Sequence, residues 1–352
     1  MKLASKYLTL LYLKYFFIVL VSLELFFIGI DFMQNFKRLP ESANIKILYL
    51  FHNSLYALNF TIVLSVILAF IIIKIILVKS NQLVSFYSLG YSKTDILRPL
   101  FLTSLVITIF YILLNFTEFA YSKERAKAIL KGQYTLNTKS DLFLKYYDTY
   151  IYFEKLYPIL KKAEDVKIFV TKDNDLIQII KAKEAKFLNN RWKIEDAIVI
   201  NKPQNITINS KIEVQKKKNF YILDGFKPKI IDNVYEAKAS FSILDAIDAM
   251  ELLNTQNINI NKIKAILLSI TIFPLFSPIV LIIIFYFTPI SYRFFNILFF
   301  TSSSIFITLS VWGVLFSLSK LSISGVILPE FAIVLPIALL SLFSFFLYIK
   351  NR

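Results

Sequence analysis

Six long apolar runs dominate the chain, and each is long enough to cross a lipid bilayer as a helix. A membrane-spanning helix needs about 20 mostly apolar residues. The runs fall into two groups of three, separated by the polar segment Tyr121–Lys262. The predicted spans are Leu8–Phe32, Leu48–Val78, Ile96–Ala120, Ile263–Phe287, Phe294–Ser317 and Val326–Ile349. We therefore expect an α-helical polytopic membrane protein with six transmembrane helices in a three-plus-three arrangement.

The segment between the two groups has the alternating pattern of β-strands. The clearest case is Asn205–Val214, where Ile206, Ile208, Ile212 and Val214 share one face. Turn-forming residues separate the runs at 172–175 and 189–190. The predicted strands are Thr149–Phe153, Val166–Thr171, Leu176–Ile180, Trp192–Ile200, Asn205–Val214 and Phe220–Leu223. This pattern predicts an all-β domain, a sandwich or a jelly-roll-like fold, inserted between the third and fourth spans.

A short amphipathic helix is predicted after the β domain, at Ser242–Leu253. Ser242 and Asp245 have the spacing of a capping box, and Ile243, Ile247 and Met250 share one face. We interpret it as a linker helix that packs on the β domain or lies at the membrane interface. The predicted domains are 1–122 for the first three spans, 123–240 for the β domain, 241–262 for the linker helix and 263–352 for the last three spans.

Composition supports a membrane protein and excludes several kinds of enzyme. Hydrophobic residues make up 57% of the 352 residues, and the mean hydropathy is +0.61. There is no cysteine, and His52 is the one histidine, so the chain alone can build neither a disulfide nor a two-histidine zinc site. Its 6 glycines form no phosphate-binding loop. We expect no catalytic residue, cofactor or metal in this chain, and we expect it not to be an enzyme.

The net charge of +16 is interpreted as a signal of membrane orientation, and nucleic-acid binding is not expected. In short loops, lysine and arginine gather on the cytoplasmic side. With six spans, most of these residues lie on one side, so we expect both termini to be cytoplasmic and the β domain to be periplasmic. That side carries Lys2, Lys6, Lys14, Lys74, Lys79, Lys93, Arg98, Arg293, Lys350 and Arg352, while Lys37, Arg38, Lys46 and Lys320 lie on the other side.

The polar interruption Asn81–Pro99 between the second and third spans is a candidate coupling element. It predicts a short helix within about residues 80–91, with Leu83, Phe86 and Tyr87 on one side and Gly90 at its C-terminal cap. An exposed apolar edge on this helix is a candidate knob for a socket in a partner protein. The alternative is a helix that lies flat among the lipid headgroups, and the composition does not separate the two.

Three charged residues in or near the first span are candidate lipid contacts. Lys37 and Arg38 follow the span at its outer end, where the insertion rule does not require cations. They either pair with the phosphate of an anionic amphiphile or extend to the interface in the ordinary way. Glu24 lies well inside the span, so it either lines a substrate cavity or makes a polar contact with another helix.

Four segments resemble the LptF/LptG (YjgP/YjgQ) family of lipopolysaccharide-export permeases, and the resemblance covers essentially the whole chain. The most specific segment is NQLVSFYSLGYSKTDILRPL, which is similar to the family's coupling segment. The others are DFMQNFKRL after the first span, NFTEFAYSKERA after the third, and LPEFAIVLPIALL in the last. DFMQNFKRL is more similar to the LptG branch of the family.

The resemblance implies an inner-membrane permease that pairs with a second LptF/LptG-type permease. An LptB-type ATPase dimer, which binds ATP and magnesium, is then expected to dock on the coupling helices at Gln82, Leu83, Phe86, Tyr87 and Gly90. Lipopolysaccharide is expected to enter between the permeases and to pass through the jelly-roll domains to LptC and LptA. Lys37 and Arg38 match basic residues with which the family contacts the lipid.

The chain departs from the family pattern in the coupling segment and at the third span. Gln82 stands where the family usually has a glutamate, so the expected ion pair with the ATPase is in doubt. Ser88 and Leu89 replace an alanine–serine pair, and Asn115 replaces a proline. Two other classes remain as alternatives: an ATPase-coupled mechanotransmission or scaffold protein, and an ion-coupled secondary transporter.

Overall fold

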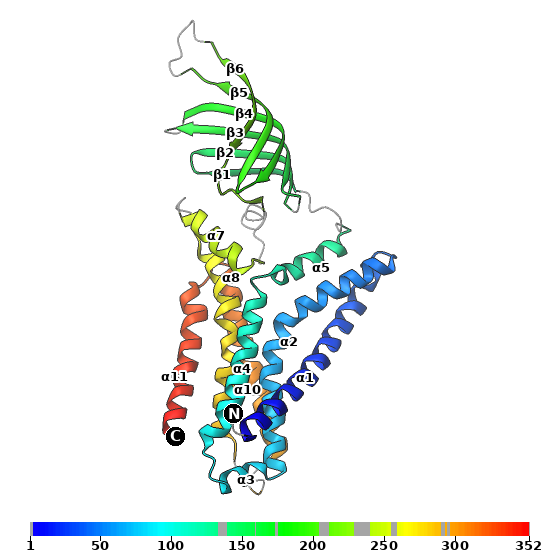
Figure 1. Ribbon diagram of the computed structural model, residues 1–352, viewed down its shortest axis with the longest axis vertical. Helices are drawn as coiled ribbons and strands as arrows, with labels where there is room; N and C mark the ends of the chain where they lie inside the picture. The colour runs from blue at the N-terminus through cyan, green and yellow to red at the C-terminus, as the bar shows by residue number, and fades with distance from the viewer. Residues whose placement is uncertain are drawn as a thin grey trace. The chain divides into compact units, whose positions relative to one another are not determined.

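A computed structural model shows two compact units, which are described separately (Figure 1). The first unit contains Met1–Leu130, Phe241–Ala246 and Ile260–Arg352, and the second contains Lys131–Ser240 and Ile247–Asn259. The structure describes residues 3–132, 139–158, 160–172, 175–203, 211–228, 240–254, 259–289, 293 and 296–351.

The first unit contains 6 helices that are long and apolar enough to cross a membrane, counted over the described residues. This confirms the predicted three-plus-three arrangement. The first three spans are α1 (Leu3–Asn35) with its terminal turn η1 (Phe36–Arg38), α2 (Ala43–Lys79) and α4 (Lys93–Leu114). The last three are α8 (Asn261–Thr271) continued by η3 (Phe273–Leu275) and α9 (Phe276–Phe287), then α10 (Ile297–Ile323), then η5 (Glu330–Val334) with α11 (Leu335–Lys350).

The third span ends earlier than the predicted Ala120. Helix α4 stops at Leu114, and the chain continues as η2 (Glu118–Tyr121) and α5 (Ser122–Leu130). The reason is a new helix start, because the Thr117 hydroxyl accepts a hydrogen bond from the Phe119 N–H at 3.3 Å. Apolar residues such as Phe116 and Phe119 continue across this boundary, so the hydrophobic pattern alone did not indicate where the span ends.

Two of the spans are interrupted, and proline is the cause in each case. The fourth span narrows to a 3-10 turn at Pro274, and the sixth begins with a π-helical turn just before Pro336. Proline has no backbone N–H and its ring crowds the preceding turn, so it removes one α-helical hydrogen bond and favours such irregular turns. The interruptions divide these spans into shorter rigid pieces.

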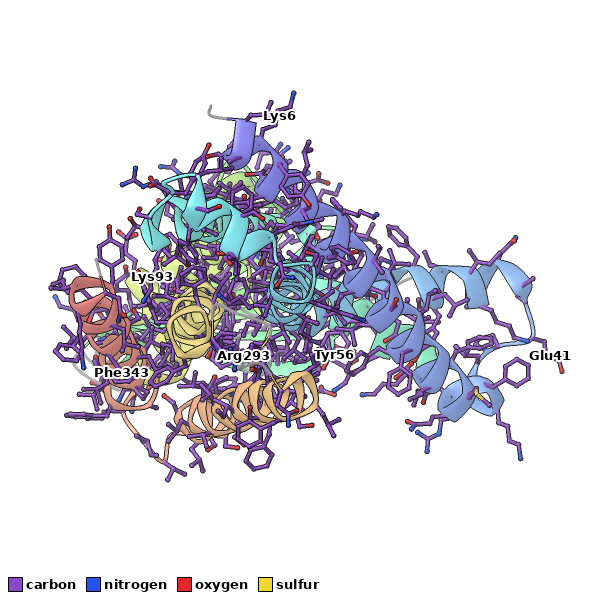
Figure 2. The ribbon with its side chains drawn as sticks, turned by 90° about the horizontal axis from the view of Figure 1, so that it is seen from below. Lys6, Glu41, Tyr56, Lys93, Arg293 and Phe343 are labelled. Atoms are coloured by element: carbon purple, nitrogen blue, oxygen red, sulfur yellow. The ribbon has the colours of Figure 1, made fainter. Side chains whose placement is uncertain are left out.

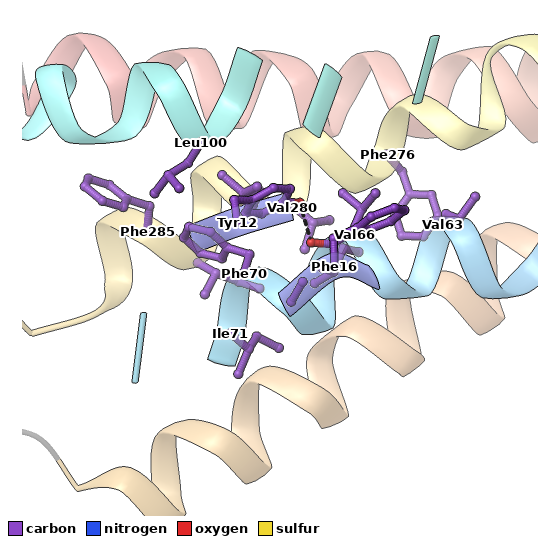
Figure 3. Close-up of a cluster of buried hydrophobic side chains, with 14 of the residues drawn as sticks. Tyr12, Phe16, Val63, Val66, Phe70, Ile71, Leu100, Phe276, Val280 and Phe285 are labelled. Carbon is purple, nitrogen blue, oxygen red and sulfur yellow. Dashed lines mark hydrogen bonds between the residues drawn. The ribbon is translucent and has the colours of Figure 1, made fainter. Parts of the chain in front are cut away.

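The core of the helical unit lies where α1, α2, α4 and α9 meet (Figure 3). The Tyr12 hydroxyl donates to the Val66 carbonyl at 2.6 Å, which satisfies a polar group that is wholly buried. Phe70, Leu100 and Phe276 pack around this pair with no exposed surface. This contact holds the first half of α1 against the centre of α2.

The second unit is a curved antiparallel sheet of six strands (Figure 1), which confirms the predicted inserted β domain. The described strands pair in sequential order, so they form one sheet and not the two facing sheets of a sandwich or jelly roll. Short turns explain this order, since Asn189 and Asn190 adopt the left-handed conformation that a two-residue hairpin requires. The strands are β1 (Lys139–Tyr146), β2 (Thr149–Tyr157), β3 (Lys162–Lys172), β4 (Asp175–Leu188), β5 (Arg191–Asn201) and β6 (Glu213–Ile222).

Two strand predictions need correction at the end of the sheet. Most of the predicted strand Asn205–Val214 lies outside the described residues, and Phe220–Leu223 is not a strand of its own. One strand, β6, runs through both regions, because its edge position tolerates the exposed lysine-rich stretch from Lys216 to Lys218. Strand β1 was not predicted.

A transverse crease crosses the sheet at the same level in its strands. At this level the strand register is interrupted, and the unpaired positions include Asp141, Glu154, Asp165, Lys183 and Glu195. On each side of it the apolar residues still face one core, but the alternation is shifted by one residue. Positive φ angles at Asp141 and Asp165 produce this shift, as in β-bulges. The two halves of the sheet therefore share a single core.

Trp192 is the centre of that core. Its Nε1–H donates to the Phe226 carbonyl at 2.7 Å, and its ring packs against Phe153. The Tyr146 hydroxyl donates to the Asp224 carbonyl from the same side. The segment after β6 is thus tied to the sheet by two side-chain hydrogen bonds.

The linker helix α7 (Ile243–Asn254) forms with one half of the predicted capping box, because the Ser242 N–H donates to the Tyr121 hydroxyl at 3.3 Å and not to Asp245. The Asp245 N–H donates to the Ser242 hydroxyl at 3.1 Å. The predicted apolar face is wrong in one respect, because Ile247 is exposed and the buried positions include Ala246 and Ala249. Small side chains let a helix approach its neighbour closely, so the alanine side faces inward.

Candidate functional site

The predicted coupling helix is present as α3 (Gln82–Ser88), at the end of the helical unit that carries both chain termini (Figure 1). Asn81 enters it with a left-handed conformation, and Gly90 leaves it with φ +81°. The Gly90 N–H donates to the Tyr87 carbonyl and the Tyr91 N–H to the Phe86 carbonyl, both at 3.0 Å. These two bonds define a Schellman ending with glycine at C′, as predicted.

The connection from α3 to the third span is short and well capped. The Asp95 N–H donates to the Ser92 hydroxyl at 3.2 Å, and the Ser92 N–H donates to the Asp95 carboxylate at 3.0 Å. This reciprocal capping box starts α4. The Phe86 and Tyr91 rings also pack edge to face, which stabilises the turn between α3 and α4. Only a few well-capped residues therefore separate α3 from α4.

The expectation that Leu83, Phe86 and Tyr87 form an exposed apolar edge is wrong. Leu83 has 0% of its surface exposed, and Phe86 and Tyr87 are half-buried against the core of the helical unit. Burying a leucine side chain stabilises a fold by about 1.5–3 kcal/mol, so the apolar side turns toward the bundle. Burial also raises the pKa of the Tyr87 phenol to about 12. These residues anchor α3 and leave its opposite side free.

We call that opposite side the α3 outer face, and it consists of Asn81, Val84, Ser85, Ser88 and Leu89. All five are exposed; Leu89 has 73% of its surface free and Val84 has 41%. Their spacing of three to four residues places them along one side of the helix. Val84 and Ser85 were not among the predicted site residues, although their place in this three-to-four-residue spacing could have indicated them.

Gln82 makes a contact within the chain. The Tyr7 hydroxyl donates to Gln82 Oε1 at 3.0 Å, which connects the beginning of α1 to α3. The Gln82 amide, at the position where the resemblance implies a carboxylate, therefore already accepts a hydrogen bond within the chain. Tyr7 was not identified from the sequence, because contacts between helices 75 positions apart leave no local pattern.

The two predicted lipid-contacting cations lie at the other end of α1, in the turn η1. Lys37 and Arg38 are exposed, and neither forms an ion pair with another residue that the structure describes. Nearby, the Lys46 ammonium lies 4.8 Å from the centre of the Phe36 ring. The buried Leu39 fixes the turn below these charges. The two cations are thus held in place while their charged ends remain free.

Glu24 lies in the contact between α1 and α2. The Thr61 hydroxyl donates to Glu24 Oε1, and the other carboxylate oxygen is buried with no hydrogen-bond partner among the described residues. Seven residues further along α1, Asp31 accepts from the Tyr49 hydroxyl and, at 3.0 Å, from the Asn53 amide. We call this pair of contacts the α1–α2 seam. Asp31 could have been found from its spacing, since residues seven apart share a helix face.

A second group of polar contacts closes the end of the third span. The Tyr121 hydroxyl donates to the Asp245 carboxylate, and the Ile243 N–H donates to the Asn115 carbonyl at 3.0 Å. Burial, together with the hydrogen bond to Asp245, raises the pKa of Tyr121 above its ordinary value. Nearby, Arg125 forms an ion pair with Glu118. The backbone carbonyl of Asn115 therefore helps to hold the start of α7.

Six spans, an inserted β domain and a small helix anchored between the second and third spans define a membrane permease subunit. The family described as lipopolysaccharide export system permease LptF/LptG matches residues 6–350. The chain belongs to this family, as the resemblance predicted. A search of curated proteins finds no significant match.

Proposed function

We propose that this chain extracts lipopolysaccharide from the inner membrane, driven by a cytoplasmic ATPase that docks on α3. The division of α3 into two faces carries the proposal. Leu83 is buried in the bundle, whereas Val84, Ser85, Ser88 and Leu89 are free for a partner. A helix that is fixed on one side and exposed on the other can receive a displacement and pass it to the spans.

The proposed partner at the α3 outer face is an LptB-type ATPase dimer, which supplies ATP and magnesium. The side chains on this face are small or apolar and carry no charge, so docking relies on shape and hydrogen bonds. Gln82 contributes through its contact with Tyr7, so the displacement also reaches α1. Lysine and arginine near this end favour a cytoplasmic location for α3 and both termini.

The proposed lipid contact is at the opposite end of α1. Lys37 and Arg38 present free cations to the phosphate groups of an anionic lipid, and arginine can bind phosphate through two parallel hydrogen bonds. Large apolar side chains of α1 and α10 point away from the bundle, among them Phe17, Phe26 and Phe306. These faces suit acyl chains or a second LptF/LptG-type permease.

Onward transfer is proposed through the β domain to LptC- and LptA-type proteins. The segment DFMQNFKRL favours the LptG branch for this chain. Glu24 adds a carboxylate below the two cations, on the side of α1 that meets α2. In this proposal Glu24 positions α1, and Lys37 with Arg38 binds the lipid.

The coupling proposal is tested with two substitutions on opposite sides of α3. Ser85→Arg places a bulky charge on the outer face, so we expect loss of the copurifying ATPase with unchanged thermal stability. Leu83→Ala removes a buried side chain, so we expect retained ATPase and a loss of about 2–5 kcal/mol in stability. Copurification, ATPase activity and thermal unfolding of the purified complex measure both effects. Full ATPase binding and transport by Ser85→Arg would contradict the proposal.

The lipid contact is tested by reversing the two charges. Lys37→Glu combined with Arg38→Glu should reduce photocrosslinking to lipopolysaccharide by about tenfold or more, because the site then repels phosphate. A matched control carries Lys127→Glu with Lys131→Glu on the exposed side of α5 and beyond it, and has the same net charge. Equal losses in both variants would show a general charge effect and exclude a specific site. Transport that continues without any ATPase would instead favour a secondary transporter.

A further inference from the structure

Lys74 is a buried cation that the transport proposal does not use. It lies in α2, five positions before the helix ends at Lys79, and only 2% of its surface is exposed. Its ammonium faces the Phe285 ring of α9 at 4.1 Å from the centroid. Within the described parts of the chain, no carboxylate forms an ion pair with it. A buried ammonium without an anion is costly, and an aromatic face compensates only part of that cost.

A second lysine interacts electrostatically with Lys74. Lys93, at the start of α4, is close enough to act on Lys74 electrostatically, and the two like charges repel. The Lys93 ammonium donates to the Asn351 side-chain carbonyl at 3.3 Å, and this acceptor is neutral. Over the described residues, neither lysine has a carboxylate in ion-pair distance. Among the described residues, two cations therefore lie at this end of the bundle without an ion-paired carboxylate.

Tyrosines from three further elements, Tyr87 of α3, Tyr286 of α9 and Tyr348 of α11, pack against the core of the same helical unit. The Tyr286 hydroxyl of α9 is buried and has no hydrogen-bond partner in the described structure. Tyr87 of α3 and Tyr348 of α11 both interact electrostatically with Tyr286. Figure 2, seen from the end that carries α3, places Lys93 beside α9 and between α11 and the start of α4. Lys74 thus meets α9 through Phe285, and Lys93 meets the end of α11 through Asn351, at the end of the bundle that carries α3.

We propose that this cluster binds the phosphate of an anionic phospholipid from the leaflet that surrounds this end of the bundle. The phosphate accepts from Lys93, which is half-buried, and its negative charge offsets that of the buried Lys74 ammonium. Basic crevices between membrane helices are typical binding places for such headgroups.

The exposed surface of α11 supports a lipid over a soluble anion. Phe345, Phe346 and Ile349 of this helix are each more than half exposed beside Tyr348. They provide an apolar surface for acyl chains next to the polar cluster. The site is independent of the proposed lipopolysaccharide contact, since Lys37 and Arg38 lie at the other end of α1. It would make anionic lipid a structural requirement next to α3.

The test uses the full complex in nanodiscs of phosphatidylcholine with increasing phosphatidylglycerol. The wild-type unfolding midpoint should rise with the phosphatidylglycerol fraction, and Lys74→Met and Lys93→Gln should each lose most of that rise. Lys79→Gln is the matched control, because it removes an exposed lysine at the same end of α2 and should keep the full rise. Lys74→Met should also be at least as stable as the wild type in pure phosphatidylcholine, since its buried charge is gone. This last result distinguishes lost lipid binding from a folding defect.

Native mass spectrometry of the complex in detergent measures the binding directly. The preference for phosphatidylglycerol over phosphatidylcholine should fall about fivefold for each lysine removed, the effect of one cation near an anionic surface. Unchanged lipid preference in both Lys74→Met and Lys93→Gln would overturn the site. If inorganic phosphate alone stabilises the wild type as much as phosphatidylglycerol does, the anion is free phosphate and the lipid assignment is wrong.

Discussion

Gly90 and Leu83, both in or beside α3, differ in how far their structural roles could be predicted from the sequence. Gly90 was identified as a helix end because an L-residue is strained at the left-handed C′ position. The direction of Leu83 was not predictable, because a 7-residue helix is too short for its apolar side to be assigned from periodicity. Its orientation depends on the surrounding spans, which only the three-dimensional arrangement defines.

At Gly90 we predict a purely conformational cost of substitution. A Cβ atom built there meets no other atom within 4 Å, so there is space for a side chain, but φ is +81°. Gly90→Ala should therefore lower stability by about 1–2 kcal/mol. Gly90→Asn should cost less, since asparagine tolerates the left-handed region. Thermal unfolding of both variants measures the difference, and equal stability of alanine and glycine at this position would contradict the interpretation.

Among the elements, the long apolar helices were predictable and the short connecting elements were not. Membrane spans follow from length and composition, and all six were found. Helix α5 and strand β1 were missed; α5 is short and polar, and it follows the 3-10 turn η2 that Thr117 caps. The crease in the sheet was not predicted either. In a sequence, a one-residue shift in the alternation of apolar and polar residues looks the same as the end of a strand.

The α1–α2 seam gives a prediction for the pair of helices. Thr61→Val keeps the shape of the side chain but removes the donor to Glu24, whose other oxygen already has no partner in the described structure. We expect a loss of about 1–3 kcal/mol, the cost of leaving a buried polar group unsatisfied. Thr61→Ser retains the hydroxyl and serves as the control. Thermal unfolding in detergent should rank the valine variant clearly below the serine variant; the reverse order would show that this hydrogen bond does not support the helix contact.

For the whole molecule, the three-plus-three layout and the inserted β domain were read from the pattern of the sequence. What the pattern could not provide were the contacts that join distant elements, such as Tyr7 with Gln82 or Lys93 with Asn351. Each of these pairs is separated by many residues and involves side chains common on any surface. They form only because the spans bring both chain ends to the same end of the bundle as α3 (Figure 1).

The absence of cysteine from the sequence allows a direct test of this topology. Leu89 and Lys37 are both exposed and lie at opposite ends of the helical unit, so each is replaced by a single cysteine in the variants Leu89→Cys and Lys37→Cys. In intact spheroplasts, a membrane-impermeant maleimide should label the cysteine at position 37 and should reach position 89 only after the membrane is opened. Labelling of both positions from the same side would contradict the six-span arrangement.

The sequential order of the β-sheet has a consequence for how the domain assembles. Each strand pairs with the strand that precedes it in the chain, so the described sheet needs no contact between distant segments to begin forming. Such local pairing favours fast folding. The sheet can therefore grow one hairpin at a time as the chain emerges from the third span, before the last three spans have been made. If synthesis stopped after β5, the first five strands could already form a sheet that lacks only its edge strand β6.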